Sequence, residues 1–129
     1  MPEALQTALI LLFALQAKHV IGDFFLQTPR MLVDRNRYLH LGRTQHAGIH
    51  AVLSGVSFLI LGAPLVFTVI ICLIELVLHY HIDFFKGRIS DAAGHTPADA
   101  GYWRAFGLDQ LAHQLTYVGM IWAWAVYAI

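Results

Sequence analysis

The sequence predicts an all-α membrane protein, a four-transmembrane-helix bundle with a polar, metal-site-like core near its cytoplasmic side. Hydrophobic residues make up 58% of the 129 residues and charged residues only 12%, against about 25% charged in soluble proteins. A soluble domain of this size could not hide so much apolar surface, whereas a bundle in lipid does not need to. The apolar stretches are also too long and too continuous for the alternating strands of a membrane β-barrel.

Four apolar stretches are expected to cross the membrane. A bilayer core of about 30 Å needs roughly 20 helical residues. The expected spans cover residues 4–27, 45–61, 64–86 and 105–128, within a single domain over residues 1–129. Pro29 is expected to stop the first helix, because proline lacks the amide donor. Ile89 to Gly101 is expected to form a polar loop between the last two spans.

The basic residues predict how the chain is oriented. They cluster in the two longer connections and are absent from the opposite side, so the positive-inside rule places both long loops in the cytoplasm. Lys18 is the exception, and it is expected either to snorkel or to pair with a carboxylate such as Glu75. The clustered residues are Arg30, Arg35, Arg37 and Arg43 after the first span, and Lys86, Arg88 and Arg104 after the third.

Ionisable residues inside the expected spans come in pairs spaced four apart. Four residues turn a helix through about 400°, so each pair stacks on one face. Such residues are costly in lipid and indicate function. The topology brings all the pairs to one level near the cytoplasmic ends of the spans. The pairs are His19 and Asp23, His46 and His50, His79 and Asp83, and Asp109 and His113.

Imidazole and carboxylate groups together are typical of a transition-metal site. These eight side chains are therefore the predicted ligands and supporting residues for one or two divalent ions, zinc in preference to iron or manganese. A single His/Asp pair would favour interhelical hydrogen bonding, at about 0.6 kcal/mol per bond. Four pairs at one level instead favour a metal site over hydrogen bonding between the helices.

The sequence leaves several functions open. The preferred hypothesis is an intramembrane metal-dependent hydrolase acting on a lipid-like substrate, with Glu75 as general base and Lys86 holding an anionic group. The alternatives are a metal-ion or proton transporter or channel, a haem or quinone protein, and a structural protein with a polar helix-pairing network. The formal net charge of zero does not indicate a nucleic-acid partner. Glycines in the spans would allow the close approach of a homodimer.

The motifs also resemble a known family. The chain is similar, over nearly its whole length, to the bacterial membrane proteins of the domain-of-unknown-function family 3307. This resemblance implies a multi-pass protein of the bacterial cytoplasmic membrane and no established activity. A looser similarity to small bacterial membrane proteins described as metal-dependent hydrolases is an analogy only. The motifs are His19-Val-Ile-Gly-Asp23-Phe-Phe-Leu-Gln27, His46-Ala-Gly-Ile-His50, His79-Tyr-His-Ile-Asp83-Phe-Phe-Lys86 and Asp109-Gln110-Leu-Ala-His113.

Overall fold

The computed structural model describes residues 1–33 and 37–129, where the regular secondary structure consists of helices and contains no strand. The prediction of an all-α protein is therefore confirmed. Arg35, one of the basic residues used to orient the chain, lies outside the described residues.

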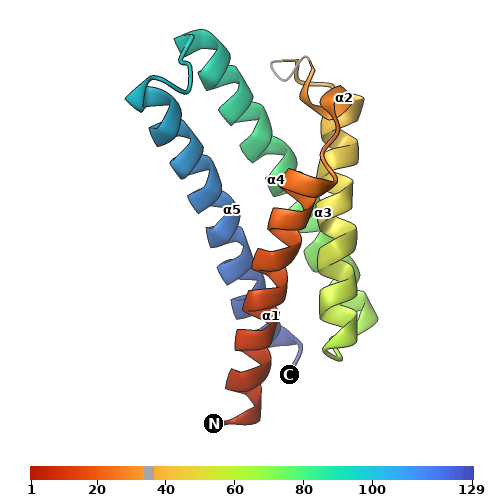
Figure 1. Ribbon diagram of the computed structural model, residues 1–129. Coiled ribbons are helices and arrows are strands. Elements are labelled where there is room, and N and C mark those ends of the chain that lie inside the picture. The colour runs from red at the N-terminus through yellow and green to blue at the C-terminus, as the bar shows by residue number, and fades with distance from the viewer. Residues whose placement is uncertain (34–36) are drawn as a thin grey trace.

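Four long helices account for most of the chain. Helix α1 (Glu3–Val20) continues directly into a π-helical turn, η1 (Ile21–Phe25), and a short helix α2 (Pro29–Leu32) follows. The other long helices are α3 (Leu41–Ile60), α4 (Leu65–Ala93) and α5 (Ala100–Tyr127). Helix α3 packs on α4, α4 on α5, and α1 on both α3 and α5. Both termini lie at one end of the molecule, and α2 and the α4–α5 connection lie at the other, here called the loop end (Figure 1).

Helix α4 extends beyond its predicted end because residues 89–93 contain neither glycine nor proline to interrupt it. The expected loop beginning at Ile89 is wrong for its first five residues, because α4 continues to Ala93. It stops at Gly94, whose φ of +63° is left-handed and favours glycine. Pro29 does not directly end the first helix. It occupies the first turn of α2, where a missing amide costs nothing.

The helices pack through different chemistry at the two ends of the molecule. Near the termini the contacts are apolar, whereas the buried side chains nearer the loop end are mostly polar. The apolar cluster contains Leu11, Leu15, Phe58, Ile71, Tyr117, Met120 and Trp124. The buried polar side chains include Lys18, His19, His46, His50, Glu75, His79, Asp109 and His113.

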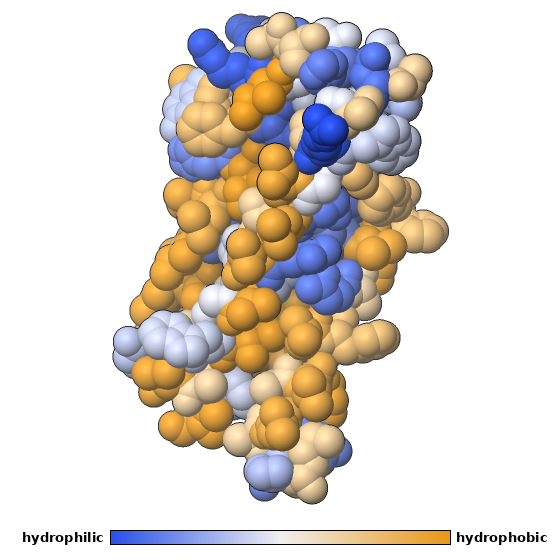
Figure 2. Space-filling view, turned by 90° about the vertical axis from the view of Figure 1, so that its left-hand side faces the viewer, coloured by the Kyte–Doolittle hydropathy of each residue, from blue (hydrophilic) through white to orange (hydrophobic). Residues whose placement is uncertain are grey.

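Among the residues that the structure describes, two helical segments are long and apolar enough to cross a membrane, Glu3–Phe25 and Leu65–Ala93. Only 28% and 22% of their most apolar windows are buried in the structure. Most of their apolar side chains therefore face outward, unlike those of a soluble protein's core helix. Figure 2 shows hydrophobic residues over much of one face and hydrophilic residues gathered at the loop end. These features support membrane association.

Candidate metal centre

The eight predicted ligands lie in one connected cluster. Helix α1 with η1 contributes His19 and Asp23, and each of the other long helices contributes one of the predicted pairs. Every member has an imidazole–carboxylate contact of 3.6 Å or less to another member. The structure thus brings together the residues that the spacing selected, and metal binding by them stays a prediction.

Asp23 faces imidazoles from two helices. Its Oδ1 lies 3.3 Å from His46 Nε2 and 3.1 Å from His50 Nε2. Its Oδ2 lies 3.2 Å from His19 Nε2. One carboxylate therefore connects the start of α3 to the end of α1.

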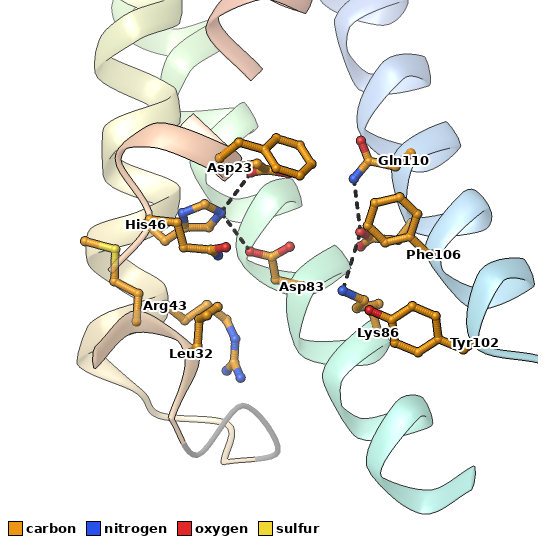
Figure 3. A pocket seen from close by; sticks show the side chains of 13 residues that line it. Asp23, Leu32, Arg43, His46, Asp83, Lys86, Tyr102, Phe106 and Gln110 are labelled. Carbon is orange, nitrogen blue, oxygen red and sulfur yellow. Dashed lines mark hydrogen bonds and ion pairs between the residues drawn. The ribbon is translucent and has the colours of Figure 1, made fainter. Parts of the chain in front are cut away.

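Asp83, on α4, also faces imidazoles from several helices. Its Oδ2 lies 3.4 Å from His79 Nε2 and 3.6 Å from His46 Nε2, and its Oδ1 lies 3.3 Å from His113 Nε2. Figure 3 shows His46 between the carboxylates of Asp23 and Asp83. The two aspartates therefore share an imidazole.

These separations fit ligands around a common cation. Zinc binds imidazole nitrogen and carboxylate oxygen at about 2.0–2.2 Å, so neighbouring ligand atoms of a tetrahedron lie about 3.4 Å apart. In the described part of the chain there are two sets of side chains, and within each set the ligand atoms lie within 4.8 Å of one another. One set is Asp23, His46, His50 and His79, and the other is His79, Asp83 and His113. His79 belongs to both.

Within residues 1–33 and 37–129, several of these buried atoms have no hydrogen-bond partner. They include Asp23 Oδ1, His50 Nε2 and both ring nitrogens of His79. Asp23 Oδ1 and His50 Nε2 lie close together, but they do not have the geometry of a hydrogen bond. An unsatisfied buried polar atom costs about 1–3 kcal/mol, and a cation between the two atoms would satisfy both.

A π-helical turn places Asp23 in the centre. The amide of Leu26 donates to the carbonyl of Ile21 at 3.0 Å, an i→i+5 bond of the kind that often occurs at functional sites. Gly22 is buried within this turn. A Cβ at position 22 would lie 2.4 Å from His50 Nε2. Glycine is therefore what allows the backbone to approach the imidazole.

His19 is held by residues that the sequence argument did not place in the site. Its Nδ1 lies 2.8 Å from the hydroxyl of Tyr117, and its Nε2 lies 3.1 Å from Gln110 Oε1. The hydroxyl of Tyr117 is therefore bonded inside the protein and supports the centre. Tyr117 lies four residues after His113, so the same spacing rule could have placed it on this face.

Lys18 pairs with Glu75, which decides between the two alternatives left open. Its side chain is buried and its ammonium contacts the Glu75 carboxylate. The same ammonium lies 3.4 Å from His50 Nδ1 and 3.3 Å from the His50 carbonyl oxygen. The role of Glu75 as a general base stays a prediction, and the carboxylate lies beside Lys18.

The family matched by the chain is described as "Protein of unknown function (DUF3307)", and the match covers residues 10–128. The chain belongs to this family. No curated protein and no solved structure matches the chain. The matched region of this DUF3307 chain contains all eight predicted ligands. The family description names no activity, so function is argued from the site.

A polar cavity of about 490 Å³ adjoins the centre in this DUF3307 chain. Asp23, His46 and Asp83 line it, and Arg43 and Lys86 bring two cations (Figure 3). Its remaining lining residues are Phe24, Gln27, Met31, Leu32, Tyr102, Phe106, Asp109 and Gln110.

The two cations of the cavity are held differently. Lys86 Nζ lies 4.0 Å from Asp109 Oδ2, beyond hydrogen-bonding distance. Arg43, interpreted from sequence as an orientation signal, is buried. Its Nη1 donates to the carbonyl oxygens of Arg37 and Tyr38 at 2.8 and 3.3 Å. Arg43 is therefore fixed by hydrogen bonds to the backbone, whereas Lys86 has a longer ion pair with Asp109.

The remaining histidines lie away from the centre. His81 Nε2 lies 3.0 Å from the hydroxyl of Tyr38, and its Nδ1 lies 2.7 Å from the carbonyl of Val77. His40 accepts the Arg43 amide at the start of α3. His95 lies against Gly101 between α4 and α5. His81 is therefore a natural control for variants of the centre.

Proposed function

We propose that this protein spans the membrane four times, binds one or two divalent metal ions, preferentially zinc, and hydrolyses a lipid-like substrate. The observation that carries the proposal is the pair of carboxylates, Asp23 and Asp83. Together they face five imidazoles from all four long helices at 3.1–3.6 Å. Such a ligand set, facing the interior of a helical protein, is the kind from which helical proteins build metal sites.

Exposed apolar side chains on the other two long helices support four spans. On α3, Val52 and Ile60 are 67% and 77% exposed, and on α5, Leu115 and Trp122 are 60% and 62% exposed. In water these faces would be a large unfavourable apolar surface, whereas lipid covers them without cost. The polar side chains of the same helices, among them His50 and His113, are buried in the interior, away from lipid.

The ligand set is larger than one structural ion requires. A closed tetrahedral zinc site needs four ligands, and the two aspartates and five histidines exceed that number. His79 belongs to both sets, which suits two neighbouring ions, as in two-metal hydrolytic sites with about 3.5–4 Å between metals. With one ion, the remaining residues would orient the ligands.

The cavity beside the centre supports hydrolysis over a purely structural site. Asp23, His46 and Asp83 belong to the centre and also line the cavity, so a substrate there would meet them. A metal ion would supply a Lewis acid and a water with a pKa near 7. In the proposed reaction water adds to an acyl or phosphoryl group, the ester bond breaks, and the leaving alcohol takes a proton. Lys86 would hold the anionic group.

Transport is less well supported than hydrolysis. A conducting path should continue across the protein as polar side chains. Towards the termini the polar cluster gives way to packed apolar residues such as Leu11, Phe58 and Met120. A transporter would have to open a polar path through this apolar half of the protein.

Elemental analysis of detergent-purified protein tests the proposal. The wild type is expected to carry about one to two equivalents of a transition metal, and His50→Ala and Asp83→Ala should lose most of it, because ligands make the dominant contribution to affinity. His81→Ala removes a histidine that contacts Tyr38 instead, and it should retain the metal. Wild-type protein that takes up no metal even when supplied with zinc, iron and manganese would overturn the proposal.

A further inference from the structure

A second cavity lies against the α4–α5 pair. Its volume is about 430 Å³. The lining consists largely of apolar and small residues, among them Ile82, Phe85, Ile89, Ala105, Leu108 and Ala112. We call this cavity the α4–α5 groove. Phe85, Ile89 and Leu108 are 56%, 60% and 67% exposed, so in the proposed membrane orientation the groove is open to lipid.

The groove shares part of its wall with the polar cavity. Lys86, Tyr102 and Asp109 line both spaces. No hydrogen bond joins Lys86 to Asp109 in this wall, since 4.0 Å separates Lys86 Nζ from Asp109 Oδ2. An ammonium group therefore lies where an apolar space meets a polar one, and one molecule with an apolar chain and an anionic head would fit both.

We propose that the α4–α5 groove holds the acyl chain of a single-chain anionic lipid whose headgroup lies beside Lys86 in the polar cavity. The lipid would reach the metal centre sideways from the bilayer, between α4 and α5. This inference rests on the proposed function for the reaction, but the groove and its shared wall are independent of any metal. Both volumes lie within the range of about 300–1,000 Å³ typical of ligand sites.

The two parts of such a lipid would contribute differently. An acyl chain that moves from bilayer to groove gains little from the hydrophobic effect, since it leaves one apolar medium for another. The anionic head gains its contact with Lys86, which is less screened there than at an open surface. The groove therefore determines where the chain lies, and Lys86 determines which head is preferred.

Photo-crosslinking tests this arrangement. The probe is a lysophosphatidic acid with a diazirine in its acyl chain, added to the purified full-length protein, and crosslinked peptides are mapped by mass spectrometry. Crosslinks are expected in α4 over residues 82–93 and in α5 over residues 101–112. Ala105→Trp, which fills the groove, should reduce them by about tenfold, which corresponds to about 1.4 kcal/mol of lost binding free energy.

Two further comparisons make the test specific. Leu115→Trp changes an exposed α5 residue that lines neither cavity, and its crosslinking should match the wild type. A monoacylglycerol probe with the same chain has no anionic head. The wild type should prefer the phosphate probe over it, and Lys86→Gln should remove that preference.

The outcomes separate this inference from the proposed function. Metal content is measured for each variant, and Ala105→Trp should retain the wild-type amount. Crosslinks spread evenly over the apolar helix faces, undiminished by Ala105→Trp, would overturn the inference. Crosslinks between two protein copies across the groove would identify a homodimer interface and would also overturn it. If the wild type holds no metal but the groove is labelled as expected, the lipid site stands and the metal proposal fails.

Discussion

Gly22 shows how closely backbone and imidazole meet in the centre. A side chain at this position would force the His50 ring to move, because a Cβ would come within 2.4 Å of His50 Nε2. We therefore expect Gly22→Ala to push the His50 ring away from Asp23 without changing any ligand. Metal affinity should fall about 10–100-fold, the range for residues that position ligands, as measured by competition with a chelator.

Gly48→Ala is the matched control for this substitution. Gly48 lies in α3 two residues before His50, and a Cβ there would meet open space. Replacement of a helical glycine by alanine should raise stability by about 0.5–1 kcal/mol and leave metal affinity unchanged. Wild-type metal affinity in Gly22→Ala would contradict the proposed role of His50 Nε2.

The buried ion pair of Lys18 and Glu75 leads to a prediction about stability. Their side chains are only 5% and 1% exposed. Lys18→Met leaves a buried carboxylate without its partner and should destabilise the protein by about 3–5 kcal/mol. The double variant Lys18→Met/Glu75→Leu removes both charges and should recover most of that loss. Unfolding of the purified protein in mixed micelles measures both effects.

The same double variant tests Glu75 as general base. If a stable, metal-loaded Lys18→Met/Glu75→Leu protein still hydrolysed its substrate at the wild-type rate, Glu75 would have only a structural role. A folded variant with metal but without activity would support the assignment.

The spacing of side chains predicted the eight members of the centre but not their supporting residues. Pairs four apart identify residues on one helix face, which is a local property. Whether His19 meets Gln110 and Tyr117 depends on which helices are neighbours, and local spacing does not determine that. The same reason explains why Lys18 remained undecided. Its partner Glu75 lies 57 positions away in the chain.

The turn η1 marks the limit of a sequence argument at the level of helices. The prediction assumed a regular helix through Asp23, at 100° per residue. Residues Ile21–Phe25 instead form a π-helical turn, which changes the direction of every following side chain. No residue pattern predicts such a turn reliably, and here the cluster around Asp23 accompanies it. The apolar stretches, by contrast, located all four long helices.

The connection between α4 and α5 makes a pH-dependent prediction. The carboxylate of Asp99 accepts hydrogen bonds from the Thr96 amide and hydroxyl, both at 2.8 Å. These bonds favour the charged form and hold the pKa of Asp99 below its ordinary value of 3.8. The stabilisation is therefore present above pH 3.8 and is lost as the pH falls through the lowered pKa.

An NMR titration measures this effect at the Thr96 amide. Its chemical shift should titrate with a midpoint below 3.8 in the wild type and should not titrate in Asp99→Asn. A wild-type midpoint at or above 3.8 would mean that the Thr96 bonds do not form in solution.

Considered as a whole, the molecule has a polar half towards its loop end and an apolar half towards its termini. Arg43, Lys86 and the candidate metal centre belong to the first, and the packed core around Leu15 and Met120 belongs to the second. With four spans, both connections at the loop end lie on one side of the membrane. The centre would then be reached from that side, or sideways from the lipid.

The number of spans can be decided from three positions. In a background with Cys72→Ser, which removes the single cysteine, new cysteines replace the exposed residues Leu39, Pro64 and Ala98. Four spans place positions 39 and 98 on one side and position 64 on the other. If only Glu3–Phe25 and Leu65–Ala93 crossed, positions 39 and 64 would share a side and position 98 would lie opposite.

An impermeant maleimide, applied to intact and to opened cells, distinguishes the four-span from the two-span topology. We expect position 64 alone to react in intact cells, because the basic residues favour the cytoplasm for the loop end. Labelling of position 98 without position 39 would contradict the four-span topology and, with it, the single level at which the four helices bring their histidines and aspartates together.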